Sequence, residues 1–172
     1  MTVHFGDGTS QASAGLAGTG KIIQVVTGTK SDVYTSNENS FTDVTGMNAS
    51  ITPTSSSNKV LVCYSINWSG TGGGHYRHRM LRGSTVVNMG DADGSCERVL
   101  GGGYMANGYL IHCSAGSFLD SPSTTSSTTY KIQHARHSGG SWTLNRNGQY
   151  SGGAAYILRG PTSHITLMEV TA

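Results

Sequence analysis

The sequence has few charged residues, few prolines and no long hydrophobic run. Charged residues make up 12% of the 172 residues, and the formal net charge at pH 7 is +2. A charge this small, without a Lys/Arg cluster, does not favour binding to nucleic acid. No apolar run approaches the roughly 20 residues of a membrane-spanning helix. The first residues, MTVHFGDGTS, lack the basic and apolar regions of a signal peptide. We therefore expect a soluble, non-secreted chain without nucleic-acid or membrane partners.

Cysteine is also scarce, with only Cys63, Cys96 and Cys113. An odd number without CxxC spacing argues against both a disulfide framework and a zinc ribbon. The sequence therefore predicts free thiols and folding in the cytosol.

Glycine is abundant instead, since 25 residues are about double the usual share. Ser and Thr fill much of the remainder, and short runs of Val, Ile, Leu and Tyr recur along the whole length. Disordered chains normally lack such runs and carry more charge. The composition thus favours one folded domain with many turns.

The clearest periodic pattern is KVLVCYSINW, residues 59–68. Its even-numbered residues, from Val60 to Trp68, share one face of a strand with period two. Leu61 and Cys63 lie on the other face, so we expect the first half of this strand to be buried on both sides. This segment is the best candidate for a central strand.

Several other segments have strand-like patterns, whereas helical periodicity is limited to a turn or two at residues 11–16, where Ser10 could cap the start. Strands are expected at residues 21–28, 32–35, 41–51, 75–82, 85–89, 104–112, 117–119, 128–137, 154–159 and 164–170. Gly-rich loops at residues 69–74, 90–103 and 138–153 either carry recognition or serve only as turns. Many short strands separated by turns predict an all-β, antiparallel β-sandwich, jelly-roll-like in arrangement.

Two stretches resemble sequences of bacteriophage virion proteins. VHFGDGTSQASA, residues 3–14, is similar to the DGT-x-Q-x-x-A segment of phage tail-fibre proteins. From Lys21 to about Val87, the motifs GKIIQVV, SFTDVTGMNASITP, NKVLV and LRGST resemble a domain common in phages of marine and freshwater bacteria. TYKIQ and ITLMEV near the C-terminus fit its later strands. Met47 stands where Leu is usual, an extra residue lies at Val44 or Thr45, and residues 90–118 have no recognised counterpart.

This resemblance implies a homotrimer of jelly-roll heads on a fibre or virion surface. Residues 1–20 would then form an N-terminal attachment or trimer-axis segment, and residues 21–172 the head domain. The function implied is that of a structural virion protein, assembled in the host cytoplasm. It would be a tail-fibre or fibre-tip subunit that contacts other virion proteins through its N-terminal segment and a host-surface glycan or protein. A capsid decoration (cement) protein is the alternative, and a glycan depolymerase is a third hypothesis.

The sequence contains no constellation that predicts an enzyme, a cofactor or a metal site. The acidic loop Asp91–Glu97 alternates oxygen ligands, but an EF-hand loop needs Gly at its sixth position and Glu at its twelfth, which this loop lacks. A polar turn is therefore expected there, with calcium as the alternative. Glycosidases need two facing carboxyl groups, and no second acidic cluster is present. No GxSxG elbow occurs either.

The histidines at 75 and 78, and those at 134 and 137, are each three residues apart. On a strand this spacing directs two rings to opposite faces, so neither pair can hold a metal within its own strand. A metal on a trimer axis would need only one His from each chain, and this alternative stays open.

One stretch, SWTLNRNGQY, offers candidate ligand-binding residues in a Gly-rich segment expected to be exposed: Trp142, Arg146 and Tyr150. An aromatic ring can stack on a sugar, and Arg supplies directed hydrogen bonds. The alternative is that Trp142 and Leu144 form one more half-buried strand. Trp68, at the end of its predicted strand, is expected at the core edge or in a trimer contact.

Overall fold

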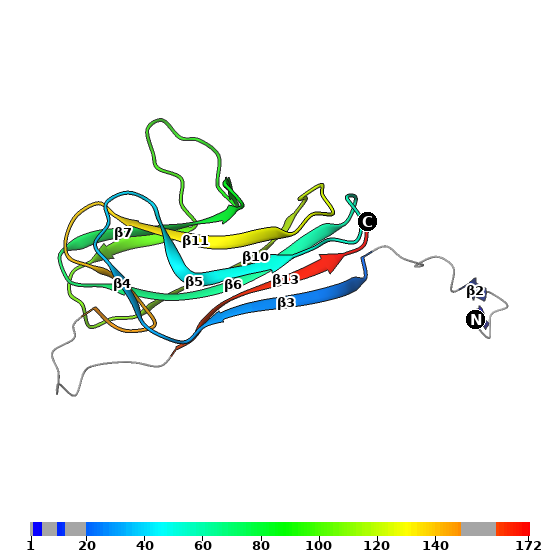
Figure 1. Cartoon of the computed structure of the whole chain (residues 1–172), viewed down its shortest axis with the longest axis horizontal. Helices are drawn as coiled ribbons and strands as arrows, with labels where there is room; N and C mark the ends of the chain where they lie inside the picture. The colour runs from blue at the N-terminus through cyan, green and yellow to red at the C-terminus, as the bar shows by residue number, and fades with distance from the viewer. Residues whose placement is uncertain (1, 5–9, 13–19, 149–160) are drawn as a thin grey trace.

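A computed structural model describes residues 2–4, 10–12, 20–148 and 161–172 of the chain (Figure 1). Residues 20–148 and 161–172 form an all-β sandwich, and residues 2–4 and 10–12 pair as a separate two-stranded sheet. Every pair of neighbouring strands is antiparallel. The predicted fold class is thereby confirmed. Within the described residues no helix is long and apolar enough to cross a membrane.

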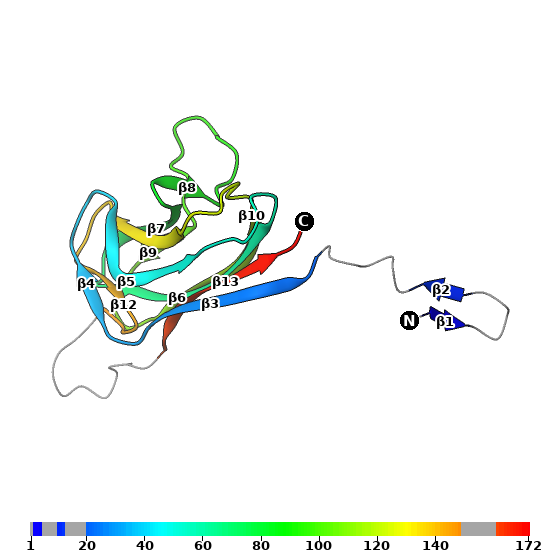
Figure 2. The same cartoon turned by 45° about the vertical axis from the view of Figure 1, so that its right-hand side comes forward.

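The strands form two layers that face each other (Figures 1 and 2). The larger sheet contains four long strands in the order β3 (Ile22–Lys30), β13 (Ser163–Val170), β6 (Lys59–Gly70) and β10 (His112–Asp120). Two short strands, β12 (Trp142–Leu144) and β4 (Tyr34–Ser36), extend this sheet, because β12 pairs with the last residues of β6 and β4 pairs with β12. The smaller sheet contains β5 (Thr42–Ile51), β11 (Thr128–Arg136) and β7 (Gly74–Arg82), with β8 (Thr85–Val87) and β9 (Gly101–Met105) both paired to β7.

The core lies between the two sheets, and β6 is central to the larger one. Val60, Val62 and Ile66 are completely buried, as the period-two pattern predicted. Leu61 and Cys63 on the opposite face are only half-buried. The expectation that both faces of β6 are buried is therefore wrong, because no second layer in the described chain covers the outer face of the larger sheet.

A glycine allows β3 of the larger sheet to lie directly against β5 of the smaller sheet. Gly28 in β3 lies so close to β5 that a Cβ atom there would be 1.9 Å from the backbone oxygen of Asn48. Only a residue without a side chain permits this approach. The edge of β3 therefore packs directly against β5.

Three local predictions need correction. Residues 104–112 form no single strand, because Asn107-Gly108 introduces a turn between β9 and β10. Residues 117–119 are the end of the nine-residue strand β10. Gln11 and Ala12 are not helical but belong to β2 (Ser10–Ala12), which pairs with β1 (Thr2–His4). The strand expected at residues 154–159 lies outside the described residues.

The first and last residues of the sandwich meet at one end of it. The Gly20 amide donates to the Thr171 carbonyl oxygen at 2.9 Å, and the Thr171 amide donates to the Lys21 carbonyl oxygen at 3.0 Å. Strand β6 begins at this end, where Lys59 pairs with Val170. Because β6 runs the length of the sheet and β7 returns antiparallel to it, Gly74 at the start of β7 lies at the opposite end (Figure 1).

Candidate functional site

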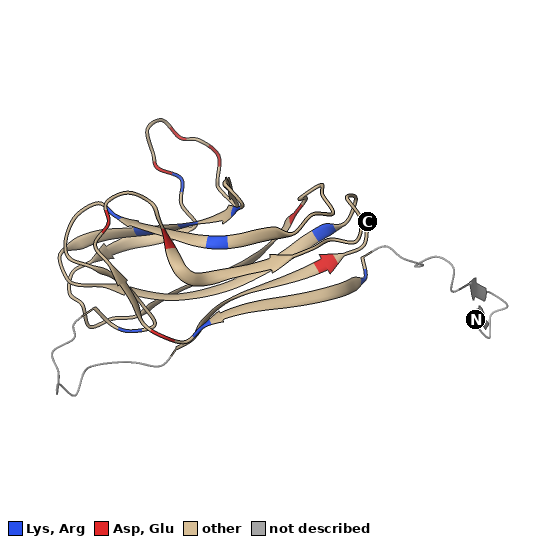
Figure 3. Cartoon of the chain, viewed as in Figure 1, with Lys and Arg blue, Asp and Glu red and all other residues tan. Residues whose placement is uncertain are grey.

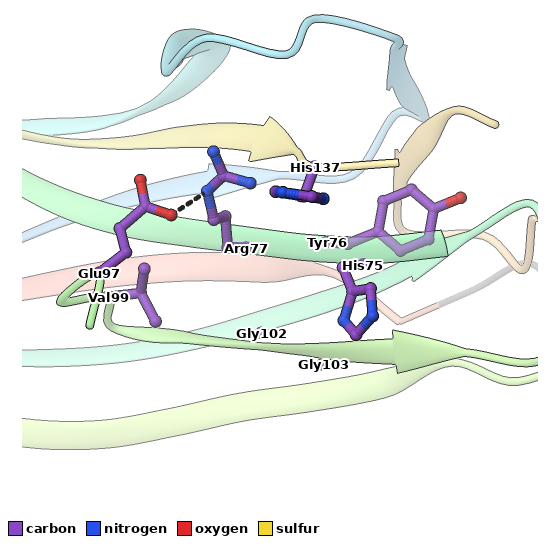
Figure 4. A pocket seen from close by; sticks show the side chains of 8 residues that line it. All are labelled: His75, Tyr76, Arg77, Glu97, Val99, Gly102, Gly103 and His137. Atoms are coloured by element: carbon purple, nitrogen blue, oxygen red, sulfur yellow. Dashed lines mark ion pairs between the residues drawn. The ribbon is translucent and has the colours of Figure 1, made fainter. Parts of the chain in front are cut away.

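A pocket of about 390 Å³ opens on the outer face of the smaller sheet, near the start of β7, and Figure 4 shows the side chains that line it. Its floor is formed by β7 and β9, which run side by side here. The residues that line it are His75, Tyr76, Arg77, Glu97, Val99, Gly102, Gly103 and His137. A pocket of this volume is in the range that holds small ligands.

An ion pair occupies one part of the pocket. The Arg77 Nε atom lies 2.5 Å from Glu97 Oε2, and Figure 4 shows the two side chains reaching toward each other. The Arg77 guanidinium also lies 5.4 Å from the centre of the Phe41 ring. The Glu97 side chain is 48% exposed, so its carboxylate keeps surface for further hydrogen bonds. This pair supplies both donors and acceptors at one site.

Aromatic rings gather at the other end of the pocket. The His75 ring lies 5.0 Å from the Tyr104 ring and 6.3 Å from the His137 ring, measured between centroids. The His137 amide donates to the His75 carbonyl oxygen at 2.9 Å, which fixes the two segments side by side. Tyr104 is 58% exposed and offers most of its ring to solvent. The two histidine rings and the ion pair thus line the same pocket, and Tyr104 adjoins His75 without being a lining residue.

Glycine keeps the floor of the pocket low. A Cβ atom at Gly102 would lie 2.5 Å from the Tyr76 carbonyl oxygen and 3.0 Å from the Arg77 Cα atom. Any side chain here would push β9 away from β7 and fill the hollow. Glycine is therefore required at position 102, whereas a Cβ atom at Gly103 would meet only the Trp68 ring, at 3.9 Å.

The two histidines of each pair point to opposite faces of the smaller sheet, as the spacing predicted. His75 and His137 are exposed, whereas His78 and His134 are buried in the core and lie opposite each other on β7 and β11. Burial lowers the pKa of His78 to about 3 and that of His134 to about 4, so both rings are neutral at pH 7. His134 stacks on Trp142 with centroids 4.9 Å apart.

The predicted ligand-binding residues do not form the pocket. Trp142 is completely buried, so the expectation that it lies in an exposed stretch is wrong. Its ring fills the core against His134 and has no free face for a ligand at the surface. Arg146 is half-buried, and Tyr150 lies outside the described residues. The alternative strand through Trp142 and Leu144 is confirmed as β12, although it is fully rather than half-buried.

The acidic loop contributes one residue to the pocket. Residues 91–97 are exposed, and the Cys96 amide closes a turn onto the Asp93 carbonyl oxygen at 2.9 Å. Glu97 is paired with Arg77. Over the residues that the structure describes, no group of three or more His, Cys, Asp or Glu side chains could hold a metal ion.

The pocket residues were missed because they come from four segments of the chain. His75 and Arg77 come from β7, Glu97 from a loop, Gly102 from β9 and His137 from the end of β11. Only pairing brings them together. In β7, His75 and Arg77 alternate with the buried Tyr76 and His78, and this alternation could have predicted their outward face. The register of β9 against β7 could not be predicted, because its three glycines carry no pattern.

Comparison of the sequence with protein-family models finds no matching family, and comparison with curated proteins finds no match either.

Proposed function

We propose that this chain is a structural protein of a bacteriophage virion, a tail-fibre or fibre-tip subunit that associates with copies of itself and contributes to host attachment. The observation that carries the proposal is the resemblance of residues 21–87 to the phage domain. These residues form β3 to β8 and so contribute strands to both sheets. The resemblance therefore extends over the framework of the sandwich rather than over one loop.

Association is supported by an apolar band across the outer face of the larger sheet. Val25, Met168, Leu61 and Leu119 lie opposite one another in adjacent strands β3, β13, β6 and β10. Val25 is 58% exposed and Leu119 is 53% exposed, while the middle two are half-buried. Directly opposed residues of neighbouring strands share a face, so the four side chains form one continuous row.

The face that carries this band has almost no charge. Of the outward residues in the four strands, only Lys59 at the edge is a Lys, Arg, Asp or Glu. Glu169, which Figure 3 colours in β13, is completely buried on the inner side. Depletion of charge marks the core of protein interfaces. Copies of the same uncharged face can meet around a symmetry axis without repulsion, which supports a homo-oligomer such as the trimer.

The apolar band and the pocket lie at different ends of the sandwich, an arrangement that suits an attachment protein. The band crosses the sheet near the start of β3, whereas the pocket lies near the start of β7. An oligomer held together by the band would repeat the pocket around its axis and leave it open. Repeated weak contacts gain avidity in this way.

The proposal is tested by labelling purified virions of the phage that encodes this chain with antibodies raised against it. Gold particles on the tail fibres or their tips are the expected result. Label on the capsid would support the decoration protein instead. Virions without label, in preparations whose major capsid protein is labelled by its own antibody, would overturn a place in the virion.

A further inference from the structure

We infer that the pocket between β7, β9 and the end of β11 binds an uncharged saccharide. The inference rests on the proposed function, because it names the class of ligand at the attachment face. It is argued from the kinds of side chain that meet in the pocket and from the space between them.

The polar groups match the hydroxyl groups of a sugar. The Glu97 carboxylate accepts hydrogen bonds, the Arg77 guanidinium donates them, and the two are already oriented by their mutual contact at 2.5 Å. Neighbouring hydroxyls on a sugar ring each donate and accept, so they can bridge such a pair. Hydrogen bonds to charged groups are stronger than neutral ones. The orientation of both side chains is fixed before the ligand arrives, which lowers the entropic cost of binding.

The aromatic groups match the other surface of a sugar. A pyranose ring carries C–H groups on its faces, and these pack on aromatic rings. The exposed rings of His75 and His137 line the pocket, and the exposed Tyr104 ring lies beside His75 without lining it. Val99 is the single aliphatic side chain among the lining residues. A lipid or an apolar peptide would find little to bury here.

The charge balance within the pocket favours a neutral sugar. Arg77 and Glu97 are the one Lys/Arg and the one Asp/Glu side chain among the lining residues, and they form an ion pair with each other. A carboxylate or sulfate on the ligand would displace the Glu97 carboxylate from Arg77 or lie beside it. An uncharged ligand avoids this repulsion.

The pocket also favours binding over hydrolysis. Glycoside hydrolysis uses two carboxyl groups about 5 to 10 Å apart. Among the residues that line the described pocket, Glu97 is the one carboxylate. The ligand is therefore expected to leave the pocket unchanged.

The test is titration of the full chain with glucose, galactose, mannose and N-acetylglucosamine, followed by NMR of the protein and by saturation transfer to the sugar. We expect at least one of them to bind with a Kd on the order of 1 mM, typical of a weak small-ligand site. His75→Ala, at an exposed lining residue, should weaken binding at least tenfold. His112→Ala is the matched control, since His112 is also exposed and does not line the pocket. Equal binding by both variants, or no binding of any of the four sugars, would overturn the inference.

A second variant tests the choice of a neutral ligand. Glu97→Gln leaves Arg77 uncompensated, so binding of the neutral sugar should fall and binding of glucuronic acid should rise. Wild-type protein that prefers glucuronic acid to every neutral sugar would contradict the inference. If antibodies label the virions but the chain binds no sugar, the saccharide proposal is rejected and the virion role stands. If the chain binds sugar but the virions carry no label, the virion role is rejected and the saccharide proposal stands.

Discussion

At the scale of single residues, Asn145 links several parts of the larger sheet from a left-handed backbone position, with φ of 60°. Its Nδ2 group donates to the carbonyl oxygens of Lys30 and Asp32 at 2.8 and 3.0 Å. Its Oδ1 atom accepts from Ser163 Oγ at 2.7 Å. Asn tolerates this φ better than most residues, so one side chain satisfies both the backbone and the buried polar groups.

Asn145→Ala should therefore lower the free energy of unfolding by about 3 kcal/mol, through lost hydrogen bonds and strain at positive φ. Asn145→Gly loses the same hydrogen bonds without the strain, so it should be less destabilising by about 1 kcal/mol. Urea denaturation followed by Trp fluorescence measures both. Equal stability of the Ala variant and the wild type would contradict this role.

The buried histidines make the fold sensitive to acid. Their folded pKa values, about 3 for His78 and about 4 for His134, lie below the ordinary value of 6.5. The unfolded chain thus binds protons that the folded chain does not, and stability falls as pH drops below 6.5. Between pH 7 and pH 5 the loss should be about 2 kcal/mol for each histidine.

His134→Leu should roughly halve this loss, because one of the two buried titrating groups is removed. The measured quantity is the difference between the unfolding free energies at pH 7 and pH 5, which is insensitive to a constant packing change. The control is His137→Gln on the exposed face, which should leave the difference unchanged. An unaltered difference in His134→Leu would show that other groups cause the acid sensitivity.

At the scale of strands, a polar cluster ties β10 of the larger sheet to β7 and β11 of the smaller one. Arg82 Nη1 donates to Asp120 Oδ1 and Oδ2, both at 2.7 Å. The Tyr130 hydroxyl donates to Asp120 Oδ2 at 2.6 Å. Burial, and then the neighbouring Asp120 carboxylate, raise the pKa of Tyr130, so its hydroxyl keeps its proton and donates.

Asp120→Ala should lower the free energy of unfolding by about 3 kcal/mol, because buried Tyr130 loses its acceptor and Arg82 keeps only its hydrogen bond to the Ser121 carbonyl oxygen. Tyr130→Phe removes only one donor and should cost about 1 kcal/mol. Thermal denaturation of the two variants separates these values. A larger loss in Tyr130→Phe than in Asp120→Ala would contradict the view that Asp120 is the centre of the cluster.

Strands in which apolar and polar side chains alternate could be predicted from the sequence. Strands that exist only because they pair with a neighbouring strand could not. The pattern of Val60, Val62 and Ile66 identified β6, because alternation records burial on one face. Strand β9 begins with three glycines, which carry no alternation, and only its pairing with β7 makes it a strand. The candidate pocket depends on that pairing, so it was not predictable. Trp142 looked exposed among glycines, but its pairing with Gly70 and Ser36 places it in the core.

At the scale of the whole molecule, the apolar band predicts association in solution. We expect light scattering after size-exclusion chromatography to give three times the chain mass of 18.0 kDa. Leu119→Lys places a charge in the band and should yield monomers that keep the β-sheet circular dichroism spectrum. Thr45→Lys, an exposed position in β5 of the other sheet, is the control and should leave the oligomer intact. A monomeric wild-type chain at high concentration would refute association through this face.

The hydrogen bonds that join Gly20 and Lys21 to Thr171 also bear on how the chain could be rearranged. Because the two ends of the sandwich lie side by side, a short linker could join them without disturbing β3 or β13. New termini could then be opened in the exposed loop at residues 91–95. Such a circular permutant keeps every strand pairing of the sandwich while it changes the order in which the strands are synthesised. Its refolding rate would show whether β3 and β13 need to be distant in sequence for the larger sheet to form.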